Sequence, residues 1–333
     1  MLPAIFGLAG PILTSDERAF FRDADPAGFI LFRRNCVDRG QMRALTHALR
    51  DSIGRDAPIL IDQEGGRVAR MAPPEWPAFP AGAAFAALYD RAPIPAIEAA
   101  AANARALGAM LREVGVNVDC LPLLDVQQPG AHDVIGDRAL GTEPMAVAAL
   151  GRAVLEGLRD AGCVGVVKHV PGHGRAGADS HKELPVVDAD EDALAIDLEP
   201  FRTLNWAPMA MTAHVVYTAW DAERPASLSP VVIADVIRGA IGFHGLLMSD
   251  DLGMSALSGD FGARAAGVVA AGCDLALHCS GDMGEMQAVA AALPAITDAA
   301  RDRLDRAMAT IADAPGADLA ENIVRRDALL AVG

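Results

Sequence analysis

Short apolar runs rich in β-branched residues recur along the whole chain and predict eight buried strands. They lie at residues 4–9, 28–32, 59–61, 114–118, 164–167, 209–213, 246–248 and 275–277. Alanine-rich stretches with helical spacing separate most of them, for example at residues 98–113, 145–160, 189–205, 231–241 and 262–271. This alternation is typical of a parallel sheet closed as a (β/α)8 barrel of the TIM type. We expect one domain over residues 1–333, with a C-terminal helix at 297–313 and a tail to residue 333 packed outside the barrel.

Polar residues follow several of the predicted strands and favour the barrel over a doubly wound open sheet, which is the structural alternative. Asp62 follows the third run, Lys168 and His169 the fifth, His214 the sixth and Asp250 the seventh. Active sites of barrel enzymes are assembled at the carboxyl ends of the strands. We therefore expect these side chains to meet at one end of the barrel.

The segment at residues 168–181 concentrates ionisable groups directly after the fifth run. Pro171, Gly172, Gly174 and Gly177 make a continuing helix or strand unfavourable, so the pattern predicts a loop. Loops on rigid scaffolds are where chemistry is usually placed. The alternative is a solvated connector without function.

Composition narrows the choice of partners. The formal net charge is -16, with 28 Lys plus Arg against 44 Asp plus Glu. Such an acidic chain is poorly suited to nucleic acids or anionic membranes, which are bound by clustered basic charge. The five cysteines are scattered and show no zinc-site spacing, and no apolar stretch approaches the roughly 20 residues that cross a bilayer. With no leader-like N-terminus, we expect a soluble cytoplasmic protein.

A second polar cluster spans residues 62–70 and contains Asp62 and Arg70 around a Gly-Gly turn. Carboxylates accept hydrogen bonds from hydroxyls and arginine donates in a fixed fork, which suits a polyhydroxylated or anionic ligand. A salt-bridged turn is the alternative. Trp76 and Phe79, in the proline-rich segment that follows, either line a pocket or cover the core.

Two further clusters add candidates. Asp250 and Asp251 end the seventh run, and we expect Asp250 to serve chemistry and Asp251 to cap the next helix. Arg138 lies between two glycines, where it either reaches a ligand or pairs with Asp137.

Together these residues suit retaining glycoside hydrolysis, which needs a nucleophile and an acid/base on opposite sides of the bond that breaks. Asp250 would attack the glycosidic carbon and His181 would protonate the leaving oxygen. Histidine suits the second task because its ordinary pKa of about 6.5 lies near cytoplasmic pH. Asp179, two residues earlier, would orient the ring.

The chain resembles the bacterial β-N-acetylglucosaminidases of glycoside hydrolase family 3. The resemblance rests on motifs in the family's order at residues 28–35, 62–68, 168–174, 179–181 and 249–252. It implies a single barrel that removes terminal β-linked N-acetylglucosamine in two steps, without a cofactor or metal. It also implies a role in cell-wall recycling, with 1,6-anhydro-muropeptides as the small-molecule substrate. At residues 119–126 the chain departs from relatives, although Asp125 remains.

The same resemblance implies roles for single residues. Asp250 matches the nucleophile, and His181 the acid/base on a mobile loop, assisted by Asp179. The sugar-binding positions are matched by Asp62, Arg70, Arg138, Lys168 and His169.

Three alternatives stay open. A phosphorylase would use the same residues, because a histidine acid/base does not repel phosphate as a carboxylate would. A metal-dependent barrel hydrolase would draw ligands from the histidines and Asp250, but Lys168 beside His169 would repel a cation. A sugar-binding protein without catalysis would need neither His181 nor Asp250.

Overall fold

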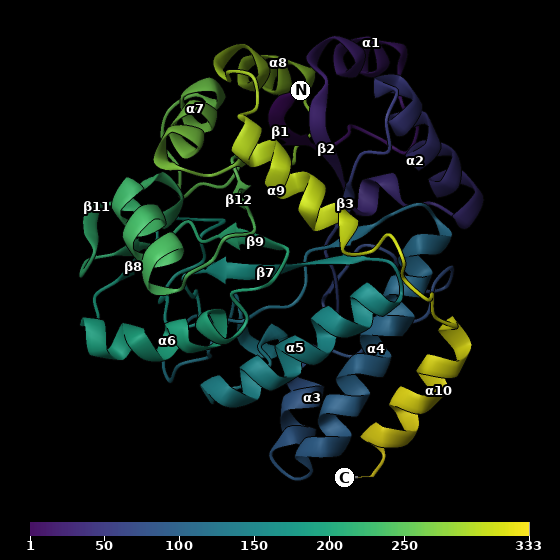
Figure 1. Ribbon diagram of the computed structural model, residues 1–333, viewed down its shortest axis with the longest axis vertical. Helices are drawn as coiled ribbons and strands as arrows, with labels where there is room; N and C mark the ends of the chain where they lie inside the picture. The colour runs from purple at the N-terminus through teal and green to yellow at the C-terminus, as the bar shows by residue number, and fades with distance from the viewer. Residues whose placement is uncertain (333) are drawn as a thin grey trace.

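The computed structural model describes residues 1–332 and contains a closed barrel of eight parallel strands (Figure 1). In chain order these are β1 (Leu2–Phe6), β2 (Pro26–Leu31), β3 (Ile59–Ile61), β6 (Val118–Asp119), β7 (Val164–Val170), β9 (Met209–Thr212), β12 (Leu246–Asp251) and β13 (Leu275–His278). Each strand pairs with its neighbours in this order, and β13 pairs with β1. The predicted (β/α)8 barrel is confirmed, and the open sheet is wrong. That residues 1–333 form one domain stays a prediction.

Helices return the chain from each strand to the next and surround the barrel. They are α1 (Ser15–Ala24), α2 (Arg39–Ile53), α3 (Gly82–Tyr89), α4 (Pro93–Glu113), α5 (Pro144–Asp160), α6 (Glu191–Thr203), the π-helix η4 (Val232–Ala240), α7 (Phe261–Ala271) and α8 (Met283–Ala292). Short 3-10 turns occur at η1 (Arg33–Asn35), η2 (Gly136–Arg138) and η3 (Ala226–Leu228). The helix predicted at residues 231–241 is thus present, but with the wider π turn.

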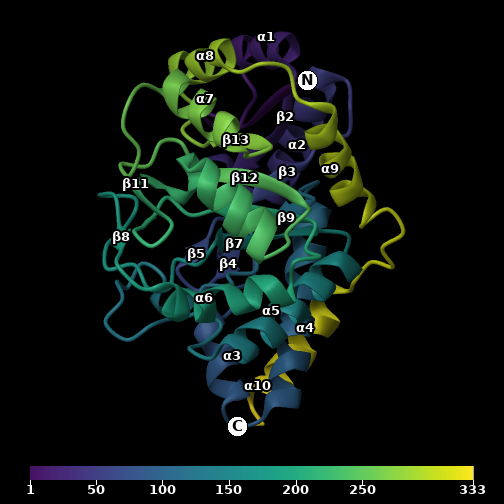
Figure 2. The same ribbon diagram turned by 60° about the vertical axis from the view of Figure 1, so that its left-hand side comes forward.

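Two small sheets lie in connections that follow barrel strands. The hairpin of β4 (Gln63–Gly65) and β5 (Val68–Ala69) follows β3. The strands β8 (Val186–Val187), β10 (Val216–Tyr217) and β11 (Asp221–Pro225) form the second sheet, at the edge of the molecule away from α10 (Figure 2). These additions lengthen the connections at the carboxyl end of the barrel.

The interior of the barrel is filled by alternate strand residues, because successive side chains of a strand point to opposite faces. The inner cluster contains Ile5, Ile30, Leu60, Val118, Val166, Met209, Met248 and Leu275, among others. The residues between them pack outward against the helices in a second cluster. Both faces of the barrel are therefore buried, which explains the uninterrupted apolar runs.

The C-terminal region closes the barrel from the end opposite the polar strand termini. Helix α9 (Asp298–Ala309) crosses the barrel (Figure 1), and its Ala300, Leu304 and Ala307 join the inner cluster. The predicted C-terminal tail contains one more helix, α10 (Leu319–Leu330), which packs beside α4 (Figures 1 and 2).

Several predicted strand boundaries are wrong. The first strand ends at Phe6, not at residue 9, and the seventh continues to Asp251, so that Asp250 lies within it. Lys168 and His169 lie within β7, not after it, because Leu124 donates its backbone N–H to Lys168 and Ala213 donates to Val170. The fourth strand begins at Val118, not at residue 114. Gly115 has a φ of 83° that ends α4, so the residues before Val118 form a turn.

Candidate active site

A cavity of about 300 Å³ opens where the polar strand ends meet. Its walls include all eight residues selected from the sequence: Asp62, Arg70, Arg138, Lys168, His169, Asp179, His181 and Asp250. They lie on β3, β6, β7 and β12 or in the connections that follow these strands. The cavity has the size of a small-molecule site.

Strand alternation explains why Lys168 faces the cavity. On β7, Val166 packs inside the barrel and Lys168 is the next residue on the same face. On β12 the pairing register shifts between Met248 and Asp251, and both Asp250 and Asp251 line the cavity. Lys168 therefore extends the regular filling of the barrel, whereas an irregularity in β12 presents two adjacent carboxylates.

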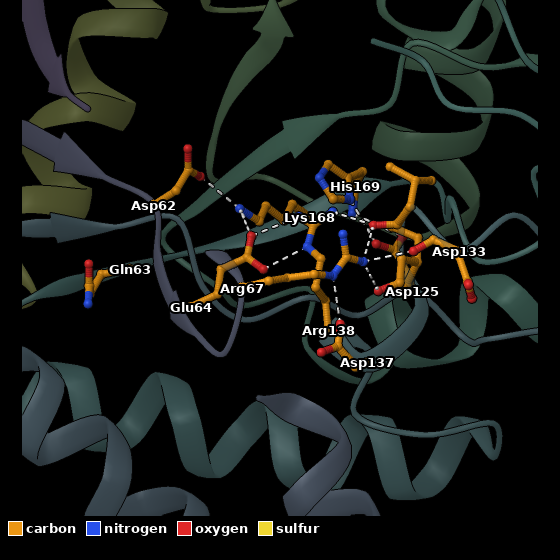
Figure 3. A network of polar contacts seen from close by, with 12 residues as sticks. Asp62, Gln63, Glu64, Arg67, Asp125, Asp133, Asp137, Arg138, Lys168 and His169 are labelled. Atoms are coloured by element: carbon orange, nitrogen blue, oxygen red, sulfur yellow. Dashed lines mark hydrogen bonds and ion pairs between the residues drawn. The ribbon is translucent and has the colours of Figure 1, made fainter. Parts of the chain in front are cut away.

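Lys168 is the centre of a buried charge network (Figure 3). Its Nζ lies 2.9 Å from Asp62 Oδ1 and 2.7 Å from Glu64 Oε1. Arg70 donates to the other Asp62 oxygen at 3.0 Å, and Arg138 donates two hydrogen bonds to Glu64 at 2.7 and 2.8 Å. Cations and carboxylates thus alternate in one continuous chain.

The opposite charges in this network shift the pKa values of its groups toward their charged forms. Burial raises the pKa of the Asp62 carboxyl, but Lys168 and Arg70 outweigh burial and hold it well below its ordinary value. Burial is likewise outweighed at Glu64, whose pKa Lys168 and Arg138 lower. At Lys168 burial lowers the pKa, but the two carboxylates raise it above the ordinary lysine value. The cavity wall therefore presents fixed donors and acceptors, which suit the hydroxyl groups of a sugar.

His169 is oriented by the buried Asp125 (Figure 3). Its Nδ1 lies 2.7 Å from Asp125 Oδ2, while the other carboxylate oxygen accepts the backbone N–H groups of His169 and His173. Burial raises the pKa of Asp125, but the two histidines lower it to about 2. The ionised Asp125 fixes the proton of His169 on Nδ1 and the direction of the ring.

Asp250 places an ionised carboxylate at the cavity wall. Its carboxylate accepts the backbone N–H of Asp251 at 2.8 Å. Burial raises its pKa, but the imidazoles of His169 and His214 and this hydrogen bond lower it below the ordinary aspartate value. The group is therefore ionised at neutral pH, at the wall of a partly closed cavity.

The exposed His181 pairs with the half-buried Asp179 at the rim. His181 Nδ1 lies 3.0 Å from Asp179 Oδ1, and its imidazole is 66% exposed. Burial raises the pKa of Asp179, but the backbone N–H and ring of His181 lower it. The charge of His181 also acts on the Asp250 carboxyl, since it contributes to the lowered pKa there. An anionic carboxylate on β12 and an imidazole in the connection after β7 thus face the same cavity.

The model of the glycosyl hydrolase family 3 N-terminal domain matches residues 12–314. The chain belongs to glycosyl hydrolase family 3. It is therefore a glycoside hydrolase, built on the barrel of that family.

Relatives of this family 3 chain agree with this assignment. It is 41% identical to a β-hexosaminidase of Alkalilimnicola ehrlichii and 38% identical to one of Bordetella avium, each over 283 residues covering 84% of this chain and 80% of the relative. Among solved structures it resembles NagZ of Neisseria gonorrhoeae in complex with N-trifluoroacetyl-D-glucosamine, with a TM-score of 0.86, 29% identity and coverage of 99% and 97%. A family 3 β-N-acetylglucosaminidase of a Paenibacillus species aligns with a TM-score of 0.82 and 32% identity, over 99% of this chain and 62% of that one.

Several details of the family 3 site differ from the sequence prediction. Asp251 does not cap the next helix. It accepts the backbone N–H groups of Gly253 and Cys279, whereas Asp260 caps α7. Asp137 pairs with Arg67 at 2.7 Å, which leaves Arg138 to Glu64.

Sequence reasoning did not single out Glu64 and His173 as site residues. Glu64 had a signal, because it is two positions after Asp62 in an extended segment, where both side chains point the same way. His173 entered only among the histidines of the metal-dependent alternative, because its contacts depend on how the connection after β7 folds back. The buried Trp76 and Phe79 cover the core and do not line the cavity.

Two features that are absent from residues 1–332 bear on the alternatives. The His, Cys, Asp and Glu side chains form no group of three or more that could hold a metal ion. No helix there is both long and apolar enough to cross a membrane.

Proposed function

We propose that this family 3 chain is a retaining β-N-acetylhexosaminidase that removes terminal β-linked N-acetylglucosamine. The observation that supports it best is the ionised Asp250 facing the same cavity as the His181–Asp179 pair. The relatives named β-hexosaminidase and the resemblance to a structure holding an N-acylated glucosamine favour the amino sugar.

In the first step, Asp250 attacks the anomeric carbon while the bond to the leaving oxygen breaks, and protonated His181 gives that oxygen its proton. The product is a glycosyl ester on Asp250. In the second step, neutral His181 takes a proton from water, whose oxygen attacks the anomeric carbon and frees the Asp250 carboxylate. Asp179 stabilises the imidazolium that exists between turnovers.

The sugar is held by the charge network. Asp62 accepts hydrogen bonds from its hydroxyls, and Arg70, Arg138 and Lys168 donate to its oxygens. His169, fixed by Asp125, offers Nε2 to the ligand. Because these groups are already ordered by one another, they bind without a large loss of side-chain entropy.

We also propose, from the family resemblance, that the natural substrates are N-acetylglucosaminyl-1,6-anhydro-muropeptides and that the enzyme acts in the cytoplasm during cell-wall recycling. Release of N-acetylglucosamine from a purified anhydro-muropeptide would support this substrate. Turnover of simple chitin fragments with no turnover of the muropeptide would contradict it.

Burst kinetics with an activated aryl N-acetyl-β-glucosaminide test the nucleophile. We expect the native enzyme to form a covalent sugar adduct on the peptide that contains Asp250. Asp250→Ala should lower kcat on the order of 10⁴-fold while N-acetylglucosamine binding stays measurable by calorimetry. Asp137→Asn, which alters an exposed ion pair at the rim, is the matched control and should change kcat little.

The alternatives predict other outcomes of the same assay. Substantial turnover by Asp250→Ala, or an adduct on another residue, would overturn the assignment. Formation of N-acetylglucosamine 1-phosphate in phosphate buffer would indicate a phosphorylase, and loss of activity after exhaustive chelation would favour a metal-dependent hydrolase.

A further inference from the structure

The connection that follows β7 has two halves, and the first is fastened firmly to the barrel. The carbonyl of Gly174 accepts the backbone N–H of Gln128 at 3.0 Å. Arg175 forms a two-point ion pair with the buried Asp197 at 2.8 and 3.1 Å. A Cβ atom on Gly174 would collide with the Val126 carbonyl, so the backbone there lies tightly against its neighbour.

The second half, residues 177–184, is attached differently. Its hydrogen bonds to the rest of the chain over residues 1–332 are both made by Ser180. The Ser180 hydroxyl lies 3.2 Å from His173 Nε2, and the Ser180 carbonyl accepts the backbone N–H of Ala256 at 3.2 Å. Ser180 is 3% exposed, although the next residue is His181, whose side chain faces solvent.

His173 is a rigid anchor for the hydroxyl. It is 3% exposed, its backbone N–H donates to Asp125 at 2.6 Å, and its ring packs edge-on against His169. Burial and the neighbouring His169 lower the pKa of His173 to about 4. The ring is therefore neutral at working pH. Its Nε2 makes the hydrogen bond with the Ser180 hydroxyl, as donor or acceptor, while its Nδ1 is buried without a hydrogen-bond partner among residues 1–332.

The second partner of Ser180 lies in the connection that carries on from the nucleophile. Ala256 follows β12, the strand that ends with Asp250 and Asp251. Ser180 therefore links the connection that bears His181 to the connection that follows β12, the strand of Asp250. Residues 177–184 are otherwise mostly exposed, so these two hydrogen bonds are what restrains them.

We propose that Ser180 is a positioning residue that fastens residues 177–184 between His173 and Ala256 and so holds the His181–Asp179 pair over Asp250. This inference rests on the proposed role of His181 as acid/base. Without the hydroxyl, the segment opens more often and the imidazole is less often within reach of the leaving oxygen.

Proteolysis at Lys182 tests the fastening without any reference to catalysis. The chain has only two lysines, Lys168 and Lys182, and Lys168 is buried within β7. A lysine-specific protease acting on the folded protein therefore reports on opening of residues 177–184. We expect Ser180→Ala to be cleaved at Lys182 roughly tenfold faster than the native enzyme, because the loss of one hydrogen bond raises the population of the open segment by about that factor. Ser258→Ala, at an exposed position in the loop of Ala256, is the matched control and should be cleaved at the native rate.

Leaving-group dependence tests the consequence for catalysis. Ser180→Ala should lower kcat/KM about tenfold for an alkyl N-acetyl-β-glucosaminide, whose leaving group needs a proton, and less than about twofold for the 2,4-dinitrophenyl glycoside. Ser180→Thr, which keeps the hydroxyl, should restore most of the loss.

The outcomes separate the two proposals. The role of Ser180 would be overturned if Ser180→Ala were cleaved at Lys182 at the native rate. It would also be overturned if Ser180→Ala lost kcat/KM equally with both leaving groups. His181→Ala is measured in parallel. If it loses equally with both leaving groups, the assignment of His181 is wrong, whereas faster cleavage of Ser180→Ala would still show that the serine fastens the segment.

Discussion

Lys168 shows how far a single residue depends on its partners. A buried ammonium without them would be strongly destabilising, yet two carboxylates within 3 Å keep it charged. The dependence is mutual. The buried carboxyls of Asp62 and Glu64 stay ionised because the neighbouring cations lower their pKa values. The sugar-binding wall is therefore a mutual arrangement, and no member of it is independent.

Replacement of Lys168 by Met should destabilise the protein by about 3–5 kcal/mol, because two buried carboxylates lose a shared cation. Urea unfolding followed by circular dichroism measures this loss. Lys182→Met removes the other lysine, which is 77% exposed, and should cost less than about 0.5 kcal/mol. A Lys168→Met loss as small as the control would contradict the picture of a coupled network.

At the scale of elements, the alternation within each strand connects the fold to the site. On β7 the period that fills the barrel with Val166 brings Lys168 to the cavity, whereas on β12 a register shift after Met248 brings both Asp250 and Asp251 there. Sequence reasoning could place these residues at strand ends, since polar side chains interrupt apolar runs there. It could not tell that β7 continues through Val170, because the pairing partners of that stretch are distant in sequence.

The capping of α7 is a case where nearby sequence misled. Two aspartates at the end of β12 suggested a cap, but α7 begins only at Phe261. Its N-cap is Asp260, whose carboxylate accepts the Ala263 N–H at 2.8 Å. Asp260→Ala should therefore cost about 1 kcal/mol in unfolding free energy and leave kcat unchanged. Denaturant titration and steady-state assays measure both. Glu143, which flanks α5 without a capping hydrogen bond, offers the control Glu143→Ala with little expected loss.

At the scale of the whole molecule, the two ends of the barrel differ in kind. One end is closed by the apolar face of α9, and the other carries the cavity and its charges. Asp119 lies between these regions on β6. Its Oδ1 accepts the Gln63 N–H at 3.0 Å, its Oδ2 is buried without a partner, and burial raises its pKa well above the ordinary value.

These opposite shifts predict the pH dependence of stability. The pKa values of Asp62 and Asp125 are lowered on folding, so their contribution is present above about pH 4 and is lost as pH falls through their folded values. Asp119 behaves oppositely, because its raised pKa makes the ionised carboxyl favour the unfolded chain at neutral pH. Asp119→Asn should therefore be more stable than the native protein at pH 7, on the order of 1 kcal/mol, with the difference vanishing below about pH 4. Thermal unfolding across pH 3–8 measures this, and a less stable Asp119→Asn at pH 7 would show that the charge is required.

Local patterning by itself determined the barrel, the order of its strands and the residues that stand at their ends, because hydrophobic period and glycine placement act over a few neighbours. The family motifs added roles to Asp250 and His181 that remain proposals. Only the tertiary structure decided which partners these residues have: Glu64 for Lys168 and Arg138, Asp125 for His169, and His173 and Ala256 for Ser180. Most of these partners are separated by dozens of residues in the chain and meet only when the strands close into a ring. Their distances and the resulting charge states therefore depend on packing that no short stretch of sequence contains.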